Sequence, residues 1–453
     1  MKQILLLLAC SITTLAAFSQ QDSLLKNFKY RIAHYRAISF NASGGSQYNK
    51  SEFASGTHKN NSSSGGGGAT YYALKSTDRI LLTTSASLYG SFNTTQSNNV
   101  GDINKSRTFS ASPRLYALNK WFSKNNFFEL GTDISANYYA SKSVGSSYPG
   151  KNKSGEYLVQ VNTGIGKGRL ENVTDMQNAI WLSKALEASD RLSQPLSSEE
   201  LNELGQTITK ANNTRVLDSR KRTQFILSTI DGYLQQKNLI NKTDINYFSN
   251  LNDILFFAFN TPRLSGIEKF IRFTPVIDGS GRDQHPSGAF NRYEENFFTE
   301  SLVLSSGINK YTPASLIHQN NYGASLKLSY ISRDITQRFY NTTGGIDELK
   351  NNAIGKQASI NLFYNHAIYP STRTIVNFYF QSEFGYQDEK NMNFYYGRAN
   401  LYGALNYFIS YRTRLTCNLG ADYQKNAYRT YQGSTGVPEN IQLYADAGIQ
   451  INL

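Results

Sequence analysis

The spacing of apolar and polar residues changes twice along the chain. Over residues 30–168, and again over residues 270–453, the two kinds of residue alternate with a period of two, which predicts β-strands. Over residues 171–259 the period is close to 3.6, which predicts helices. The chain is therefore expected to have two β-rich blocks with a helical block between them.

The alternation is most regular at the end of the chain, over residues 440–453. The residues between the apolar positions are polar or small, so the two faces of this strand differ sharply. Such a strand suits a wall with lipid on one side and water on the other. The apolar positions are Ile441, Leu443, Ala445, Ala447, Ile449, Ile451 and Leu453.

The connections between the expected strands alternate between short and long. Outer-membrane barrels have short periplasmic turns and long external loops, which gives every strand a direction. The short connections are residues 76–78, 123–126, 309–315, 368–372 and 410–412, and the long polar ones are residues 47–68, 94–105, 142–154, 332–356 and 430–440.

This polarity requires a strand that the local pattern supports poorly. The helical block leaves from the periplasmic side, and the strand at residues 297–308 runs back toward it, so an outward crossing must lie between them. Ile267 to Ile277 is the only candidate. It makes fourteen strands rather than thirteen, and single-chain bacterial barrels have even numbers. We predict an all-β transmembrane antiparallel barrel of about fourteen strands with an α-helical periplasmic insertion, whose last strand closes against the first.

The helical block shows signals for four helices. Thr174 or Asp175 could cap the first, and Ser197 with Glu200 forms a capping box for the second. The third and fourth are expected over residues 217–236 and 243–257. None is long and apolar enough to span a bilayer. We expect a bundle at the periplasmic mouth, either below the barrel, inside its lumen or against a partner.

The first nineteen residues predict an export signal, with cleavage before Gln20. A lipoprotein signal ending at Cys10 is the weaker alternative. Cleavage leaves Cys417 as the one cysteine, which excludes an internal disulfide and favours a Gram-negative envelope protein over a small secreted scaffold. The expected division is residues 1–19 for the signal, 20–168 and 263–453 for the two halves of the barrel, and 169–262 for the insertion.

Composition supports this interpretation. The chain has 31 Tyr, 26 Phe and 34 Gly but 3 Met, as aromatic girdles and glycine-containing strands would require. The formal charge of +13 comes from dispersed residues. Because the chain is expected to be exported, the phosphates of lipid and lipopolysaccharide are a better counter-charge than nucleic acid.

Catalytic, metal and cofactor motifs are not apparent, so we do not expect an enzyme. Residues 164–168 are glycine-rich but lack phosphate-loop spacing, and are expected to form a flexible exit turn. His285 with Asp283 fits an exposed loop better than a catalytic pair. Charged residues on the polar strand faces are expected to line the lumen, where they either set ion selectivity or pair and seal it. They are Glu129, Asp133, Glu383, Arg398, Arg414, Asp422 and Asp446.

The last residues, with Gly448, Ile451 and Leu453, resemble the C-terminal assembly signal of outer-membrane barrels, with Leu453 where an aromatic residue is commoner. The resemblance implies recognition by the barrel-assembly machinery. The export signal, the Tyr/Asn/Ser-rich strands and the helices after Gly164 resemble a poorly characterised group of Bacteroidota outer-membrane proteins with a periplasmic helical insertion.

Two functions are compatible with this sequence. The first is a porin-like channel or uptake pore for small solutes. The second is a non-conducting barrel that anchors its helical domain to a periplasmic or export partner.

Overall fold

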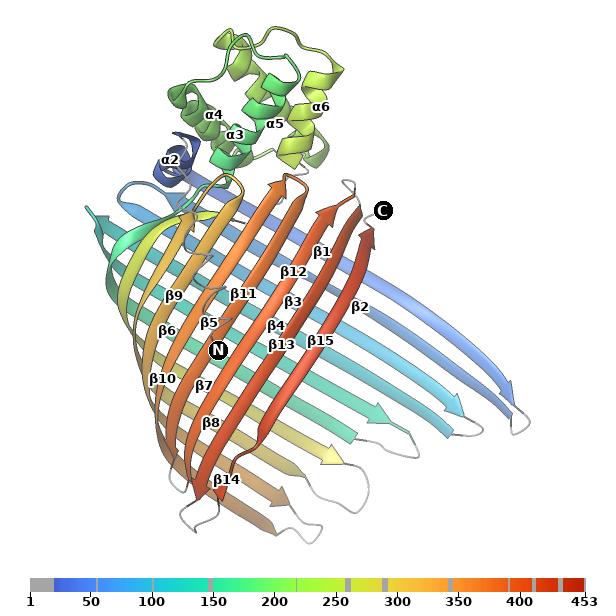
Figure 1. Cartoon of the computed structure of the whole chain (residues 1–453). Helices are drawn as coiled ribbons and strands as arrows, with labels where there is room; N and C mark the ends of the chain where they lie inside the picture. The colour runs from blue at the N-terminus through green and yellow to red at the C-terminus, as the bar shows by residue number, and fades with distance from the viewer. Residues whose placement is uncertain are drawn as a thin grey trace.

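The strands of the computed structural model form one antiparallel sheet in which neighbours along the chain pair with each other (Figure 1). The structure describes residues 20–53, 56–99, 102–145, 150–216, 218–256, 262–286, 292–340, 345–389, 392–409, 413–430 and 435–451. The expected signal segment and Leu453 lie outside these ranges. The strands are β1 (Ile32–Phe53), β2 (Gly56–Ser76), β3 (Ile80–Asn99), β4 (Asp102–Ser123), β5 (Asn126–Val144), β6 (Gly150–Asn172), β7 (Leu264–Pro286), β8 (Tyr293–Pro313), β9 (His318–Tyr340), β10 (Ile346–Ser371), β11 (Thr374–Glu389), β12 (Met392–Phe408), β13 (Thr413–Thr430), the two-residue β14 (Thr435–Gly436) and β15 (Glu439–Ile451).

Fourteen of these strands are long, which confirms the predicted number. The crossing at Ile267 to Ile277 is confirmed as part of β7, which pairs with β6 on one side and β8 on the other. Its alternation is poor because Lys269 and Pro275 interrupt the apolar face, yet its backbone pairs with both neighbours, with a break in the β6 ladder at Pro275.

The predicted long loops are wrong in extent. β1 and β2 remain paired as far as Phe53 opposite Gly56, and β9 and β10 as far as Tyr340 opposite Ile346. A membrane crossing needs about 9–11 residues of tilted strand, whereas β1 has 22. Polar composition predicted loops, but a hairpin in water can continue its backbone ladder with polar residues on both faces.

Apolar side chains form an exposed belt on the outward face of the sheet. Exposure reaches 65% for Leu419 and 76% for Leu443. An apolar surface on this scale belongs in hydrocarbon, and an antiparallel sheet carrying it is the architecture of an outer-membrane β-barrel. In the part of the chain that the structure describes, no helix has the length and apolarity to cross a membrane. The belt includes Ile38, Leu88, Leu115, Ile134, Val161, Ile271, Leu304, Leu328, Leu362, Phe380, Leu401, Leu419 and Leu443.

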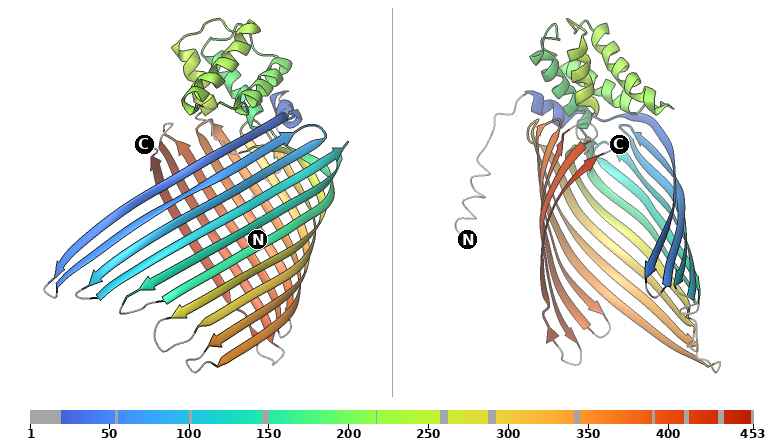
Figure 2. Two further views of the ribbon diagram at one scale, coloured as in Figure 1. Left: turned by 180° about the vertical axis from the view of Figure 1, so that it is seen from behind. Right: turned by 90° about the vertical axis from the view of Figure 1, so that its right-hand side faces the viewer.

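The predicted closure of the barrel is not present. Among the described residues β1 pairs with β2 alone, and β15 pairs with β13 alone. Figure 2 shows that β1 and β15 run in different directions and separate toward the end away from the helices. The sheet is therefore open between these two strands, because their directions diverge as the sheet twists.

Among the described residues, five helices lie together at the end of the sheet where β10 turns into β11 (Figures 1 and 2). Four match the predicted helices: α3 (Thr174–Ala188), α4 (Ser198–Asn212), α5 (Ser219–Gln236) and α6 (Ile245–Phe256). The capping box of α4 is present, with Glu200 N donating to Ser197 Oγ and Ser197 N donating to the Glu200 carboxylate. The remaining helix, α2 (Gln20–Asn27), was not predicted.

The predicted cap of α3 is wrong. Val173 occupies the N-cap position and makes no side-chain cap bond. Thr174 Oγ1 accepts a hydrogen bond from the backbone N–H of Arg263, and Asp175 turns into the bundle. Thr174 and Asp175, which the local sequence predicted as caps, instead form hydrogen bonds with residues of other elements.

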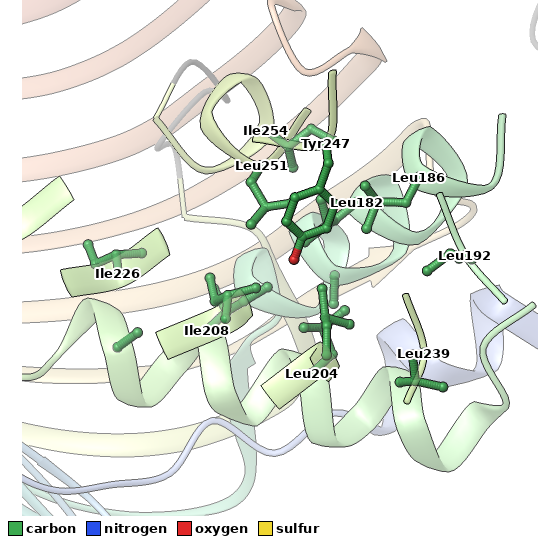
Figure 3. Packing of buried hydrophobic residues seen from close by; sticks show 14 residues of the cluster. Leu182, Leu186, Leu192, Leu204, Ile208, Ile226, Leu239, Tyr247, Leu251 and Ile254 are labelled. Atoms are coloured by element: carbon green, nitrogen blue, oxygen red, sulfur yellow. The ribbon is translucent and has the colours of Figure 1, made fainter. Parts of the chain in front are cut away.

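The helices share one apolar core (Figure 3). It combines Leu182 and Leu186 of α3 with residues of the other three helices. Leu25 of α2 and Phe28, which follows that helix, pack with Val173, Met176 and Ile180 at the base of the bundle. The other core members include Leu204, Ile208, Ile230, Leu234, Tyr247 and Leu251.

Asp175 is a buried acid in this bundle. Thr209 Oγ1 and Asn212 Nδ2 donate to its carboxylate at 2.8 and 3.0 Å. Burial raises the pKa of Asp175, although these two hydrogen bonds act in the opposite direction. A raised pKa means that folding favours the protonated acid, so this contribution to stability is present at acidic pH and is lost as pH rises through the raised pKa.

We expect Asp175→Asn to remove this pH dependence, since an amide can keep both partners without a charge. In the full-length protein, wild-type protection of α3 and α4 amides against hydrogen exchange should fall as pH rises from about 4 toward 7, and that of the variant should not. The exposed Glu187→Gln on the same helix is the control. Equal pH slopes for wild type and D175N would contradict this account.

Residues 164–168 are not the flexible exit turn that their glycines predicted. They lie inside β6, and the chain leaves the sheet four residues later. Gly168 and Gly266 have φ angles of +96° and +126° and lie two pairs apart on β6 and β7. At each, a Cβ would overlap a backbone carbonyl of the facing strand. The two glycines thus permit close, twisted pairing where the sheet passes into the helices.

We expect Gly266→Ala to destabilise the folded protein by about 2–3 kcal/mol, because alanine adds backbone strain and a steric overlap. The urea midpoint for unfolding in detergent micelles measures this. Gly403→Ala is the matched control, since a Cβ there meets only ordinary contacts. Equal midpoints for both variants would show that the positive φ is not required.

Candidate functional site

The inward face of the sheet carries the predicted lumen residues. Register places Glu129 opposite Lys120, Glu383 opposite Arg398, and Asp446 opposite Asn418. These positions alternate with the exposed apolar belt, so they point away from lipid. The structure divides them between two regions, which we call the β4–β7 wall and the β11–β15 wall.

The β4–β7 wall contains a buried charge network. Lys120 Nζ donates to both carboxylate oxygens of Glu268 at 2.7 Å and lies 3.4 Å from Glu129. Arg272 Nη2 donates to Glu129 at 3.2 Å. Glu129 is fully buried, so removing any one partner would leave an uncompensated charge at a cost of about 3–5 kcal/mol.

Asp133 belongs to the same wall. It forms a two-point ion pair with Arg114, at 2.7 and 3.1 Å. Of the seven predicted lining residues, Glu129 and Asp133 are therefore paired with cations that the sequence prediction omitted. Lys120, Glu268 and Arg272 could have been found by the same rule, because they too are charges on the inward face of a strand.

The β11–β15 wall carries the other five. Tyr396 Oη donates to Glu383 at 3.1 Å, Asn418 Nδ2 donates to Asp446 at 2.7 Å, and Arg414 donates to Gln450 at 2.9 Å. Asn400 donates to Asp422, and Arg398 lies over the Tyr396 ring. Within the described ranges none of these five forms an ion pair, so this wall presents neutral amides and unneutralised charges together.

Glycine and aromatic residues face each other across the strands. In eight directly opposed pairs the ring lies over the glycine, where a Cβ would overlap it. This packing covers the bare backbone and fixes the ring against the sheet. The pairs are Gly65–Phe92, Gly68–Tyr89, Gly166–Phe127, Gly279–Tyr157, Gly307–Phe270, Gly323–Phe363, Gly385–Tyr396 and Gly420–Tyr444.

Arg263 joins the helical bundle to the rim of the sheet. Its side chain is 1% exposed and donates to Gln319 Oε1 at 2.9 Å and to the carbonyls of Leu316 and His318 at 2.7 and 2.8 Å. The guanidinium also lies over the ring of Tyr369. One side chain thus holds the start of β7 against the β8–β9 turn and the end of β10.

Two further contacts hold the bundle in place. Trp181 of α3 packs against the cores of the bundle and against Ala367, Tyr369 and Ile375 at the β10–β11 hairpin. Arg373 in the turn of this hairpin donates to Asp253 of α6 at 3.1 Å. The helices therefore form a packed cover on the rim.

We expect Arg263→Ala to loosen the cover far more than Arg373→Ala. Loss of Arg263 leaves Oε1 of the buried Gln319 without its donor and removes the charged hydrogen bonds to the turn carbonyls, at about 3 kcal/mol, whereas the partly exposed Arg373–Asp253 pair should contribute less than about 1 kcal/mol. Limited proteolysis of the refolded full chain should cleave near the helices about 100-fold faster in R263A and less than about fivefold faster in R373A. Similar rates would contradict the assigned role of Arg263.

The other candidate residues show no assembled chemistry. His285 Nε2 lies 3.1 Å from Asp283, which also forms an ion pair with Arg292. His285 and Asp283 lie near the end of β7 rather than in the predicted loop. Cys417 is a free thiol. No cluster of His, Cys, Asp and Glu suited to a metal occurs among the residues that the structure describes. Gly448 lies opposite Thr416 on the last strand, and its role in assembly stays a prediction.

Comparison with known proteins finds no matching family model and no matching curated protein. Solved structures with a similar strand arrangement include the β-domain of the Bordetella autotransporter BrkA, with 9% identity, 83% of this chain and 99% of that chain covered, and a TM-score of 0.29. The Pseudomonas putida toluene transporter TodX shows 9% identity, coverage of 95% and 94%, and a TM-score of 0.28. The Yersinia pestis receptor FyuA shows 7% identity, coverage of 92% and 72%, and a TM-score of 0.29. At these values no residue role can be transferred.

Proposed function

We propose that this chain is an outer-membrane channel that passes small polar solutes, with its helical bundle covering the periplasmic mouth. The observation that carries the proposal is the contrast between the faces of one sheet. The outer face is an apolar belt, and the inner β11–β15 wall bears amides and charges that are not neutralised by ion pairs. A barrel that served only as an anchor could fill its interior with paired charges, as the β4–β7 wall does.

The partners follow from the same proposal. Lipid and lipopolysaccharide would surround the belt, and the assembly machinery would read β15 during insertion. We retain the kinship with Bacteroidota proteins as a prediction. The alternative function, a non-conducting anchor for a periplasmic partner, is favoured by the tight packing of the bundle on the rim.

Deletion of the helical bundle tests whether the chain conducts. Val173 N donates to the Arg263 carbonyl at 2.7 Å, so residues 174–261 can be replaced by a short glycine linker without moving the strand ends. We expect wild-type protein to conduct in planar bilayers and the deletion variant to show a larger single-channel conductance. Folded protein that conducts in neither form would favour the anchor.

Charge on the β11–β15 wall should set ion selectivity. We expect Asp446→Asn to shift the reversal potential in a salt gradient toward anions, since it removes a negative charge from the lumen. Glu187→Gln, outside the barrel on α3, should leave the potential unchanged. An unchanged potential in D446N, with conductance intact, would show that ions do not pass along the β11–β15 wall.

A further inference from the structure

A row of tyrosines crosses the β11–β15 wall. Tyr379 of β11 lies opposite Tyr402 of β12, which lies opposite Gly420 of β13, which lies opposite Tyr444 of β15. The Tyr444 ring covers Gly420, so the row has aromatic surface at all three tyrosines with no side chain projecting between the last two.

Two of these rings are held by hydrogen bonds, and the third packs on Gly420. Tyr402 Oη donates to Asn418 Oδ1 at 2.5 Å, and Tyr379 Oη donates to Gln381 Oε1 at 2.6 Å. Tyrosine with a satisfied hydroxyl presents a rigid, flat apolar face at low entropic cost. The row is thus a preformed platform rather than a set of mobile side chains.

A second row, rich in amides, lies beside it on the side away from the helices. Gln381, Asn400, Asp422 and Gln442 are in register on the four strands, two residues from the tyrosines. With Glu383 and Arg398 they line a cavity of about 390 Å³. Amides and carboxylates supply donors and acceptors in the same plane, and the volume lies within the range of small-ligand sites.

We propose that the β11–β15 wall binds a neutral oligosaccharide. A pyranose ring has apolar C–H faces and a rim of hydroxyl groups, so it needs flat aromatic surface next to closely spaced donors and acceptors. The tyrosine row and the amide row provide these side by side. The β4–β7 wall does not, because its charges are bonded to one another. This inference names a substrate class for the proposed channel and rests on that function.

The experiment uses the full chain in planar bilayers, with maltohexaose and chitohexaose as probes and polyethylene glycol of equal size as the reference. We expect a hexasaccharide to interrupt the current at millimolar concentration while the polyether does not. Tyr402→Ala and Asn400→Ala should each lower its apparent affinity at least about tenfold. Tyr407→Ala, whose ring is on the lipid face of the same strand, should not change it.

Equilibrium dialysis of the same saccharides against detergent-solubilised protein separates the two proposals. A conducting channel that neither saccharide blocks, and that retains neither in dialysis, would overturn the inference and leave the channel intact. Saccharide retention without conductance would support saccharide binding at the wall and reject the channel. Equal block by the polyether, or no effect of Y402A and N400A in folded protein, would also overturn it.

Discussion

The structure depends on one constraint: backbone N–H and C=O groups inside hydrocarbon must be hydrogen-bonded within the protein. The antiparallel ladders from β1 to β13 and from β13 to β15 meet this requirement strand by strand. It explains why β7 exists in spite of its weak alternation, because β6 and β8 would otherwise face lipid with bare edges. It also identifies the seam between β1 and β15 as the least satisfied part of the described sheet, since each of these strands has one paired edge.

The features that could be predicted from the sequence are those set by residue periodicity and by the direction of each strand. Strand number, the crossing at Ile267 to Ile277 and four helices all follow from such local patterns combined with topology. The ends of elements were harder, because they depend on partners distant in sequence. Asp175 is an example: its position suggested a cap, but Thr209 and Asn212 of α4 bind its carboxylate inside the bundle.

The sequence could predict which charged residues share one face of the sheet, but not which of them contact one another. Alternation put these charges on the face opposite the apolar belt, but it could not show which would meet a counter-charge. Glu129 of β5 meets Lys120 of the adjacent β4 and Arg272 of β7, which lies beyond β6, whereas Glu383 faces Arg398 without an ion pair. The glycines at residues 164–168 were misread for a similar reason. They predicted a flexible turn, but register places Gly166 inside β6 with the ring of Phe127 over it.

The helical bundle and the β11–β15 wall are connected through the β10–β11 hairpin. Arg373 in the β10–β11 turn is bonded to α6, and Ile375 at the start of β11 packs against Trp181 of α3. Four residues after Ile375 the same strand presents Tyr379, and then Gln381 and Glu383, on the inner wall. The bundle and the tyrosine row are thus in contact with opposite ends of one strand, and an unbroken ladder from Thr374 to Glu389 fixes that strand against β12.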